Sequence, residues 1–293
     1  MNSEEKLAHI AGIDFVPSQI QIGQYNINYI TAGSGPPLIL LHGINIGWAQ
    51  WYANLAEFAK HFSVYALDLP GAGTSTKIDF KNCNLEKDFV ETVETFIMRK
   101  NLAAGVSLIG HSLGGWIALR LAIRGKLNIR NMVLVSPMGF LDYVPKRYKP
   151  VAFYPIATLL TKTVFNPNPQ KMQKFCFDVM HKDNRANLTD EFVFHLCQSI
   201  AEDKRAHPLL LINRLTNFTK IAKELVLTDQ LSGISTNTLI VIGDKDPLIP
   251  AKKILSLSHL LPNAKIKIFP KTGHLPPIES STLFNQVVIE FLK

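Results

Sequence analysis

A serine flanked by glycines is the first feature of this sequence that could perform covalent chemistry. The pattern Gly110-His111-Ser112-Leu113-Gly114 lies between an apolar strand pattern at residues 106–109 and a helix pattern at residues 113–124. On a sharp turn between a strand and a helix, residues two positions on either side of the serine must lack bulk. The helix that starts beside the serine offers free N–H groups that favour negative charge. The pattern therefore predicts that Ser112 is a nucleophile on a strained turn.

A serine hydroxyl needs a base within hydrogen-bond reach, and the sequence offers one after a later strand pattern. Histidine suits this task because its ordinary pKa lies near neutral pH, and a carboxylate must then orient the imidazole. His274 and Asp246 each follow a predicted strand, in the order serine, acid, histidine. Asp244 is an alternative acid, and Asp142 is a remote third candidate. The Asp-Pro-x-x-Pro turn that begins at Asp246 favours this residue over the other two.

Four further segments complete a pattern that resembles the α/β-hydrolase superfamily, specifically its capped esterase, lipase and lactonase-like branch. They occur in the family's order, from about residue 19 to the C-terminus, apart from the middle of the chain. The resemblance implies that Asp246 is the acid and His274 the base of a catalytic triad. The segments are His42-Gly43, Asp68-Leu69-Pro70-Gly71-Ala72-Gly73-Thr74-Ser75, Gly243-Asp244-Lys245-Asp246-Pro247-Leu248-Ile249-Pro250, and Gly273-His274 followed by Glu279.

The resemblance also implies the remaining parts of the site. The backbone N–H groups of Ile44 and Leu113 form the oxyanion hole, and no cofactor is needed. Family members that open epoxides or displace halide carry an aspartate at the elbow, so Ser112 indicates acyl transfer through an acyl-enzyme. We expect hydrolysis of a carboxylic ester of a small to medium apolar substrate. A carbon–carbon bond hydrolase or a cofactor-free haloperoxidase-like enzyme is the alternative on the same triad, and a non-enzymatic use of the fold is the third.

The elements that must position these residues alternate between strand and helix patterns. This alternation predicts an α/β fold with a mainly parallel, doubly wound sheet, and the resemblance specifies the α/β-hydrolase fold. The alternation stops in the middle of the chain, so we expect a core domain of residues 1–138 and 226–293 and a helical cap insertion at residues 139–225. The predicted strands are a pair within 19–30, then 38–41, 64–67, 106–109, 132–135, 238–242 and 265–269, and the predicted helices are 48–60, 85–100, 113–124, 251–260 and 280–292.

Other polar and aromatic side chains near these motifs have structural interpretations. We expect His42 to shape the oxyanion loop, His111 to pack inside the elbow, and Asp68 to tie its own loop together. Core packing is the default prediction for the three tryptophans, which are Trp48, Trp51 and Trp116.

Composition argues against several other classes of protein. The 293 residues carry a formal charge of +8, but the basic residues are dispersed apart from Lys146, Arg147 and Lys149, so we expect no nucleic-acid partner. The three cysteines form no CxxC pair and the histidines show no ligand spacing, so we expect no metal site. The N-terminus has no apolar leader segment, and no apolar stretch is long enough to span a bilayer. We therefore expect a cytoplasmic protein.

The predicted cap is where substrate choice should be decided. Its apolar residues predict the roof of an apolar pocket, or the core through which the cap docks on the sheet domain. The basic, aromatic segment at residues 146–153 is an alternative, weak contact site for a membrane surface. The apolar residues concerned are Phe153, Tyr154, Ile156, Leu159, Leu160, Phe165, Phe175 and Phe177.

Overall fold

The computed structural model describes residues 3–14, 17–44, 46–145, 149–150, 152, 156, 159, 167–201, 203–217 and 220–293. Its centre is an eight-stranded sheet in the order β1-β2-β4-β3-β5-β6-β9-β10. The β1–β2 and β2–β4 pairs are antiparallel, and every later pair is parallel, which confirms the predicted mainly parallel sheet. The strands are β1 (Pro17–Ile22), β2 (Tyr25–Ala32), β3 (Pro37–Leu41), β4 (Ser63–Leu67), β5 (Val106–His111), β6 (Ile129–Val135), β9 (Asn237–Gly243) and β10 (Ala264–Phe269).

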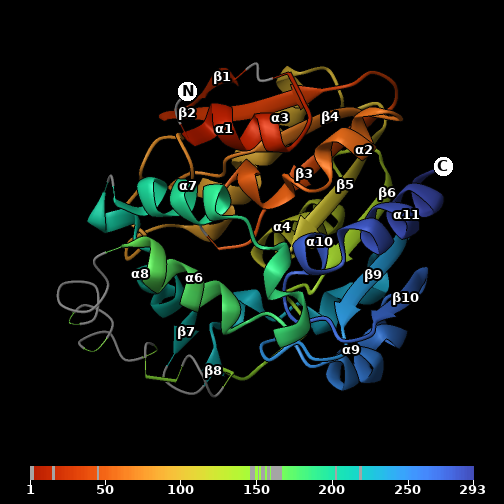
Figure 1. The fold of residues 1–293 in the computed structure, drawn as a ribbon. Helices are drawn as coiled ribbons and strands as arrows, with labels where there is room; N and C mark the ends of the chain where they lie inside the picture. Colours follow the sequence, from red (N-terminus) through yellow and green to blue (C-terminus); the bar gives the residue numbers. More distant parts are fainter. Residues whose placement is uncertain are drawn as a thin grey trace.

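Helices pack against both faces of the sheet, as the doubly wound prediction requires (Figure 1). Helix α2 contacts α11 in one layer, and α4 contacts the helical turn Leu85–Val90 in the other. The helices are α1 (Ser3–Ile10), α2 (Leu55–Ala59), α3 (Glu91–Arg99), α4 (Leu113–Arg124), α6 (Pro169–Phe177), α7 (Asp190–Ala201), α8 (Pro208–Arg214), α9 (Ala251–Leu257), α10 (Pro276–Glu279) and α11 (Ser281–Leu292).

The central strands are buried on both faces because helices cover the sheet on each side. Every residue of β5 is buried, and so are the last four residues of β3 and of β6. Continuous apolar runs suit such strands, since neither face meets water. The carboxyl ends of parallel strands lie at one edge of the sheet, where ligands of open α/β sheets bind. The loops after β3, β5 and β9 therefore meet at this edge.

Some predicted elements differ from the observed ones in length. The expected helix at residues 48–60 is a 3-10 turn, Trp48–Trp51, followed by the short helix α2. Asn54 lies between the two, and its buried amide donates hydrogen bonds to the carbonyl of Pro277 and to the side chain of Asn285. The helix α1 was not predicted, and it packs against α7. All three tryptophans are buried, which confirms their predicted place in the core.

The stretch between β6 and β9 adds no strand to the large sheet within its described residues. It contains α6, α7 and α8, which lie together beside the sheet in Figure 1, and a small antiparallel pair, β7 (Thr216–Asn217) and β8 (Lys220–Ile221). The boundaries of the cap at residues 139–225 stay a prediction. Most of the basic, aromatic segment at 146–153 lies outside the described residues, so its membrane contact also stays a prediction. Within the described part of the chain, no helix has the length and apolarity needed to cross a bilayer.

Candidate active site

Ser112 lies on a strained turn between β5 and α4. Its backbone has φ 51° and ψ −109°, outside the regions that side chains with a Cβ prefer. Gly114 makes the turn possible, because a Cβ on this residue would lie 2.2 Å from the backbone oxygen of Leu41. The turn places Ser112 at the carboxyl end of β5 and at the start of a twelve-residue helix. This close approach explains why the motif has a glycine two positions after the serine.

His274 and Asp246 form a hydrogen-bonded pair in the loops that follow β10 and β9. His274 Nδ1 lies 2.9 Å from Asp246 Oδ2. The other carboxylate oxygen, Oδ1, accepts the N–H groups of Leu248 and Ile249 at 2.8 and 2.9 Å. Burial opposes ionisation of Asp246, but the attraction of His274 and these hydrogen bonds outweigh it, so the pKa of Asp246 lies below its ordinary value. Asp246 is therefore an ionised partner for His274.

The other two candidate acids make no such contact. Asp244 accepts the N–H of Thr272 at 3.2 Å, and its second oxygen lies 3.4 Å from the ammonium of Lys245. Asp142 is exposed. Of the three aspartates considered from the sequence, the structure places Asp246 against the His274 imidazole.

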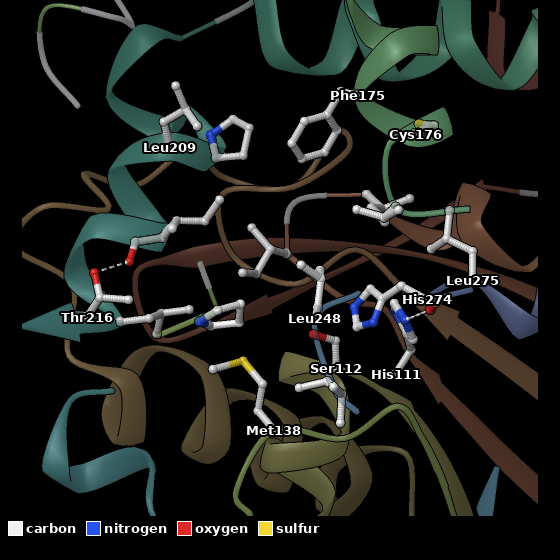
Figure 2. Close-up of a pocket in the computed structure, with 18 of the residues that line it drawn as sticks. His111, Ser112, Met138, Phe175, Cys176, Leu209, Thr216, Leu248, His274 and Leu275 are labelled. Atoms are coloured by element: carbon white, nitrogen blue, oxygen red, sulfur yellow. Dashed lines mark hydrogen bonds between the residues drawn. The ribbon is translucent and has the colours of Figure 1, made fainter. Parts of the chain in front are cut away.

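Ser112 and His274 share one end of a deep pocket (Figure 2). The pocket is open to solvent, and its volume is about 1250 Å³ when the space at its mouth is included. None of its described lining residues is a lysine or an arginine. Apolar side chains make most of the wall, from the sheet domain below and from the predicted cap above. They include Ile44, Met138, Leu248, Phe175, Leu209 and Ile212. Figure 2 shows Phe175 and Leu209 on the wall across from Ser112.

Of the two predicted oxyanion-hole residues, one lines the pocket and the other follows Ser112 in the chain. Ile44 lines the pocket wall after β3, and Leu113 is the first residue of α4, directly after Ser112. Their roles as donors stay a prediction. The N–H of Gly43 donates to Gln50 Oε1 at 2.9 Å, which fixes the loop just before Ile44.

His42 and Asp68 have the structural contacts expected of them. The Nε2 atom of His42 accepts the N–H of Leu69 at 2.9 Å. Asp68 accepts the N–H groups of Trp48 and Thr74, so it ties its own loop to the loop that follows β3. Both side chains hold the loop after β3 in place, and neither is among the described residues that line the pocket.

Two residues, His111 and Glu279, hold the loop around His274 through hydrogen bonds that were not predicted from the sequence. His111 Nε2 lies 2.8 Å from the carbonyl oxygen of His274, so it donates to that oxygen, and burial lowers the pKa of His111 to about 3. The buried carboxylate of Glu279 accepts the N–H groups of Gly273 and Leu275 at 2.8 and 2.9 Å. The acidic residue five positions after the histidine was visible in the sequence, but its function as a backbone acceptor was not.

A strained serine between a strand and a helix of a mainly parallel sheet, beside a histidine–aspartate pair, is the architecture of the α/β hydrolases. The family model described as alpha/beta hydrolase fold matches residues 36–281. The chain therefore belongs to the α/β-hydrolase fold family and is a hydrolase of that fold.

Individual relatives within this family have different reported activities. The chain is 26% identical to a pimeloyl-[acyl-carrier protein] methyl ester esterase of Nitrosomonas europaea, over 86% of this chain and 93% of the relative. It is 25% identical to a 2-hydroxy-6-oxo-6-phenylhexa-2,4-dienoate hydrolase of Burkholderia cepacia, over 92% of each chain. The solved structure of carboxylesterase CesB from Bacillus subtilis superposes with a TM-score of 0.77 at 20% identity, covering 99% of this chain and 95% of that one.

Proposed function

We propose that the protein is a serine hydrolase that cleaves carboxylic esters with a neutral, apolar acyl group. The single observation that supports this most is the strained Ser112 beside the His274–Asp246 pair at the end of an apolar pocket. Esterases among the relatives agree with this activity. In this proposal residues 139–225 are the cap, and its described helices α6, α7 and α8 supply the upper wall of the pocket.

The reaction proceeds in two stages through an acyl-enzyme. His274 takes the hydroxyl proton of Ser112 while Oγ attacks the ester carbonyl, and Asp246 stabilises the resulting imidazolium. The imidazolium then gives its proton to the leaving alcohol. A water activated by His274 releases the acid in the second stage. The N–H groups of Ile44 and Leu113 stabilise the oxyanion, and each such donor contributes about 3 kcal/mol to the transition state.

The pocket wall favours the ester hydrolase over the carbon–carbon bond hydrolase. A dienoate, the substrate class in the name of the Burkholderia cepacia relative, carries a carboxylate, and burying a charge is costly unless it is paired. Among the described lining residues there is no lysine or arginine, and away from Ser112, His111 and His274 the polar side chains are those of His207 and Thr216. An uncharged acyl chain can enter such a wall without leaving a charge unpaired, and each buried CH₂ contributes about 0.8 kcal/mol to binding.

Hydrolysis of p-nitrophenyl esters of increasing acyl length tests this function. The wild type should turn over a range of chain lengths, and Ser112→Ala should lose essentially all of this turnover. Ser107→Ala is the matched control, because Ser107 is a buried serine on β5, the strand that leads to Ser112, and is not among the described residues that line the pocket. A wild type that hydrolyses no ester, but cleaves a dienoate, would replace the ester proposal with the carbon–carbon bond alternative.

A further inference from the structure

The carboxylate of Glu279 holds the peptide groups on both sides of His274. Its Oε2 accepts the N–H of Gly273 at 2.8 Å, and its Oε1 accepts the N–H of Leu275 at 2.9 Å. Glu279 is 2% exposed and ends the short helix α10. Among the described residues, no lysine or arginine forms an ion pair with it. Peptide N–H groups therefore balance this buried charge.

The same carboxylate reaches the segment Val179–His181, which follows α6 in the predicted cap. Oε2 also accepts the N–H of His181 at 2.7 Å. The N–H of His274 itself donates to the carbonyl of Val179 at 2.8 Å. Two hydrogen bonds therefore join the loop around His274 to the segment Val179–His181: one from His181 to Glu279 and one from His274 to Val179.

The two backbones are in direct contact at Gly273. A Cβ on this residue would lie 2.3 Å from the oxygen of Val179 and 2.9 Å from the nitrogen of His181. Only a glycine permits this approach. On the other side, the carbonyl of His274 accepts a hydrogen bond from His111, the residue before the nucleophile. The backbone around His274 is therefore fixed from the cap and from the elbow at once.

We propose that Glu279 is a positioning residue, which sets the His274 imidazole relative to Ser112 and Asp246 by holding the backbone of residues 273–275 against Val179–His181. This role rests on the proposed hydrolase function of Ser112 and His274. A carboxylate is required because both of its oxygens accept hydrogen bonds. A glutamine of the same shape has one such oxygen, and its NH₂ group would face at least one of the three N–H groups.

The variant Glu279→Gln tests this role, with Asp244→Asn as its matched control. Asp244 is a carboxylate in the neighbouring loop that accepts one peptide N–H and does not contact His274. The measurements are kcat and KM for p-nitrophenyl acetate and for the longest ester accepted, with the rate at which a fluorophosphonate labels Ser112. We expect Glu279→Gln to lower kcat about 10²-fold, since a small misplacement of a catalytic group has this effect. The loss should be the same for both esters, KM should stay near the wild-type value, and labelling should slow in parallel.

Two results would overturn the proposal. One is wild-type kcat and labelling in Glu279→Gln. The other is a loss confined to the KM of the long ester, which would assign Glu279 to the shape of the pocket. If Glu279→Gln does not fold, Glu279→Asp provides the same comparison. The shorter side chain keeps the negative charge but places the carboxylate farther from the three N–H groups. Failure of both variants to fold would assign Glu279 to stability alone and also overturn the proposal.

The wild type separates this inference from the proposed function. A wild type that hydrolyses no ester but is labelled at Ser112 would contradict the ester substrate, and the labelling rates of wild type and Glu279→Gln would still decide the role of Glu279. A wild type that neither hydrolyses esters nor reacts with the fluorophosphonate would overturn both.

Discussion

The imidazole of His274 and the carboxylate of Asp246 meet at 2.9 Å, between Nδ1 and Oδ2. A carboxylate accepts hydrogen bonds and does not donate them, so Nδ1 carries the proton. Nε2 is then left with a free electron pair, which is the form a general base requires. The backbone N–H groups of Leu248 and Ile249 donate to the other carboxylate oxygen, so they fix the orientation of the Asp246 side chain.

Replacement of Asp246 by asparagine should therefore remove most of the activity. The amide can donate to Nδ1, which would stabilise the wrong tautomer of His274 and leave the imidazolium without a counter-charge. We expect kcat for p-nitrophenyl esters to fall about 10³- to 10⁴-fold. Circular dichroism and thermal unfolding would show whether the variant keeps its fold.

The neighbouring Asp244 provides the control for this substitution. It contacts the N–H of Thr272 and not His274, so Asp244→Asn should change kcat by less than about twofold. Equal losses in the two variants would contradict the assignment of Asp246 as the acid.

The length of acyl chain that the pocket admits should depend on α8. Leu209 and Ile212 on α8 and Leu215 directly after it lie three residues apart and line the pocket, so one face of this helix forms part of its wall. Ile212→Trp would fill the space across from the sheet domain. We expect it to lower kcat/KM for long-chain p-nitrophenyl esters about 10-fold or more while turnover of the acetate changes little.

Leu210→Trp is the matched control, because Leu210 lies on the same helix and does not line the pocket. It should leave the preference for chain length as in the wild type. If Ile212→Trp lowered the turnover of acetate and long-chain esters by the same factor, α8 would not determine chain length.

Local sequence signals predicted the strands of the sheet and singled out the aspartate that contacts His274 in the structure. Buried parallel strands are continuous apolar runs, so their positions in the sequence could be predicted, and α4 was predicted with its observed bounds. The choice of Asp246 over Asp244 rested on the Asp-Pro-x-x-Pro turn. The structure gives the physical reason, because this turn directs the N–H groups of Leu248 and Ile249 at the carboxylate of Asp246.

The contacts that hold the site together could not be predicted, because they join residues distant in sequence. Glu279 and His181 are 98 positions apart, and His111 and His274 are 163 apart. Nothing in the local pattern of either partner specifies the other. The helix α1 was missed for a related reason: it is only eight residues long, and its burial depends on α7.

The contribution of α1 to stability can be measured by truncating its buried face. Leu7 is fully buried, and its replacement by alanine should lower the free energy of unfolding by about 2–4 kcal/mol through lost burial and the cavity left behind. Ile10, on the same helix, is 43% exposed, so Ile10→Ala should cost less than about 1 kcal/mol. Equal effects in urea unfolding would show that α1 does not pack as described.

Stability at acidic pH should depend on the ion pairs that anchor the elbow helix. Arg120 and Arg124, near the end of α4, donate to the two carboxylate oxygens of Glu86 at 3.0 and 2.8 Å. Burial opposes ionisation of Glu86, but these hydrogen bonds and the two positive charges outweigh it, so the pKa of Glu86 lies below its ordinary value of 4.5. In the window below 4.5 the unfolded chain binds a proton at this site and the native protein does not. The stabilisation is therefore complete above pH 4.5 and is lost as the pH falls toward the native pKa.

The variant Glu86→Gln has no carboxyl group to ionise at this position, so comparing it with the wild type isolates the effect of the Glu86 charge on stability. Its Tm should lie below that of the wild type near pH 6, and the difference should narrow as the pH is lowered below 4.5, because the unfolded wild-type chain then gains a proton at Glu86 that the native protein does not bind. Glu57→Gln is the control, since Glu57 pairs with Lys60 on the exposed surface of α2 and such pairs contribute little. A Tm difference between wild type and Glu86→Gln that stays constant as the pH is lowered from 6 through 4.5 would contradict the lowered pKa of Glu86. A narrowing difference would show that the charge of Glu86 holds α4, and with it the turn that carries Ser112, against the turn Leu85–Val90.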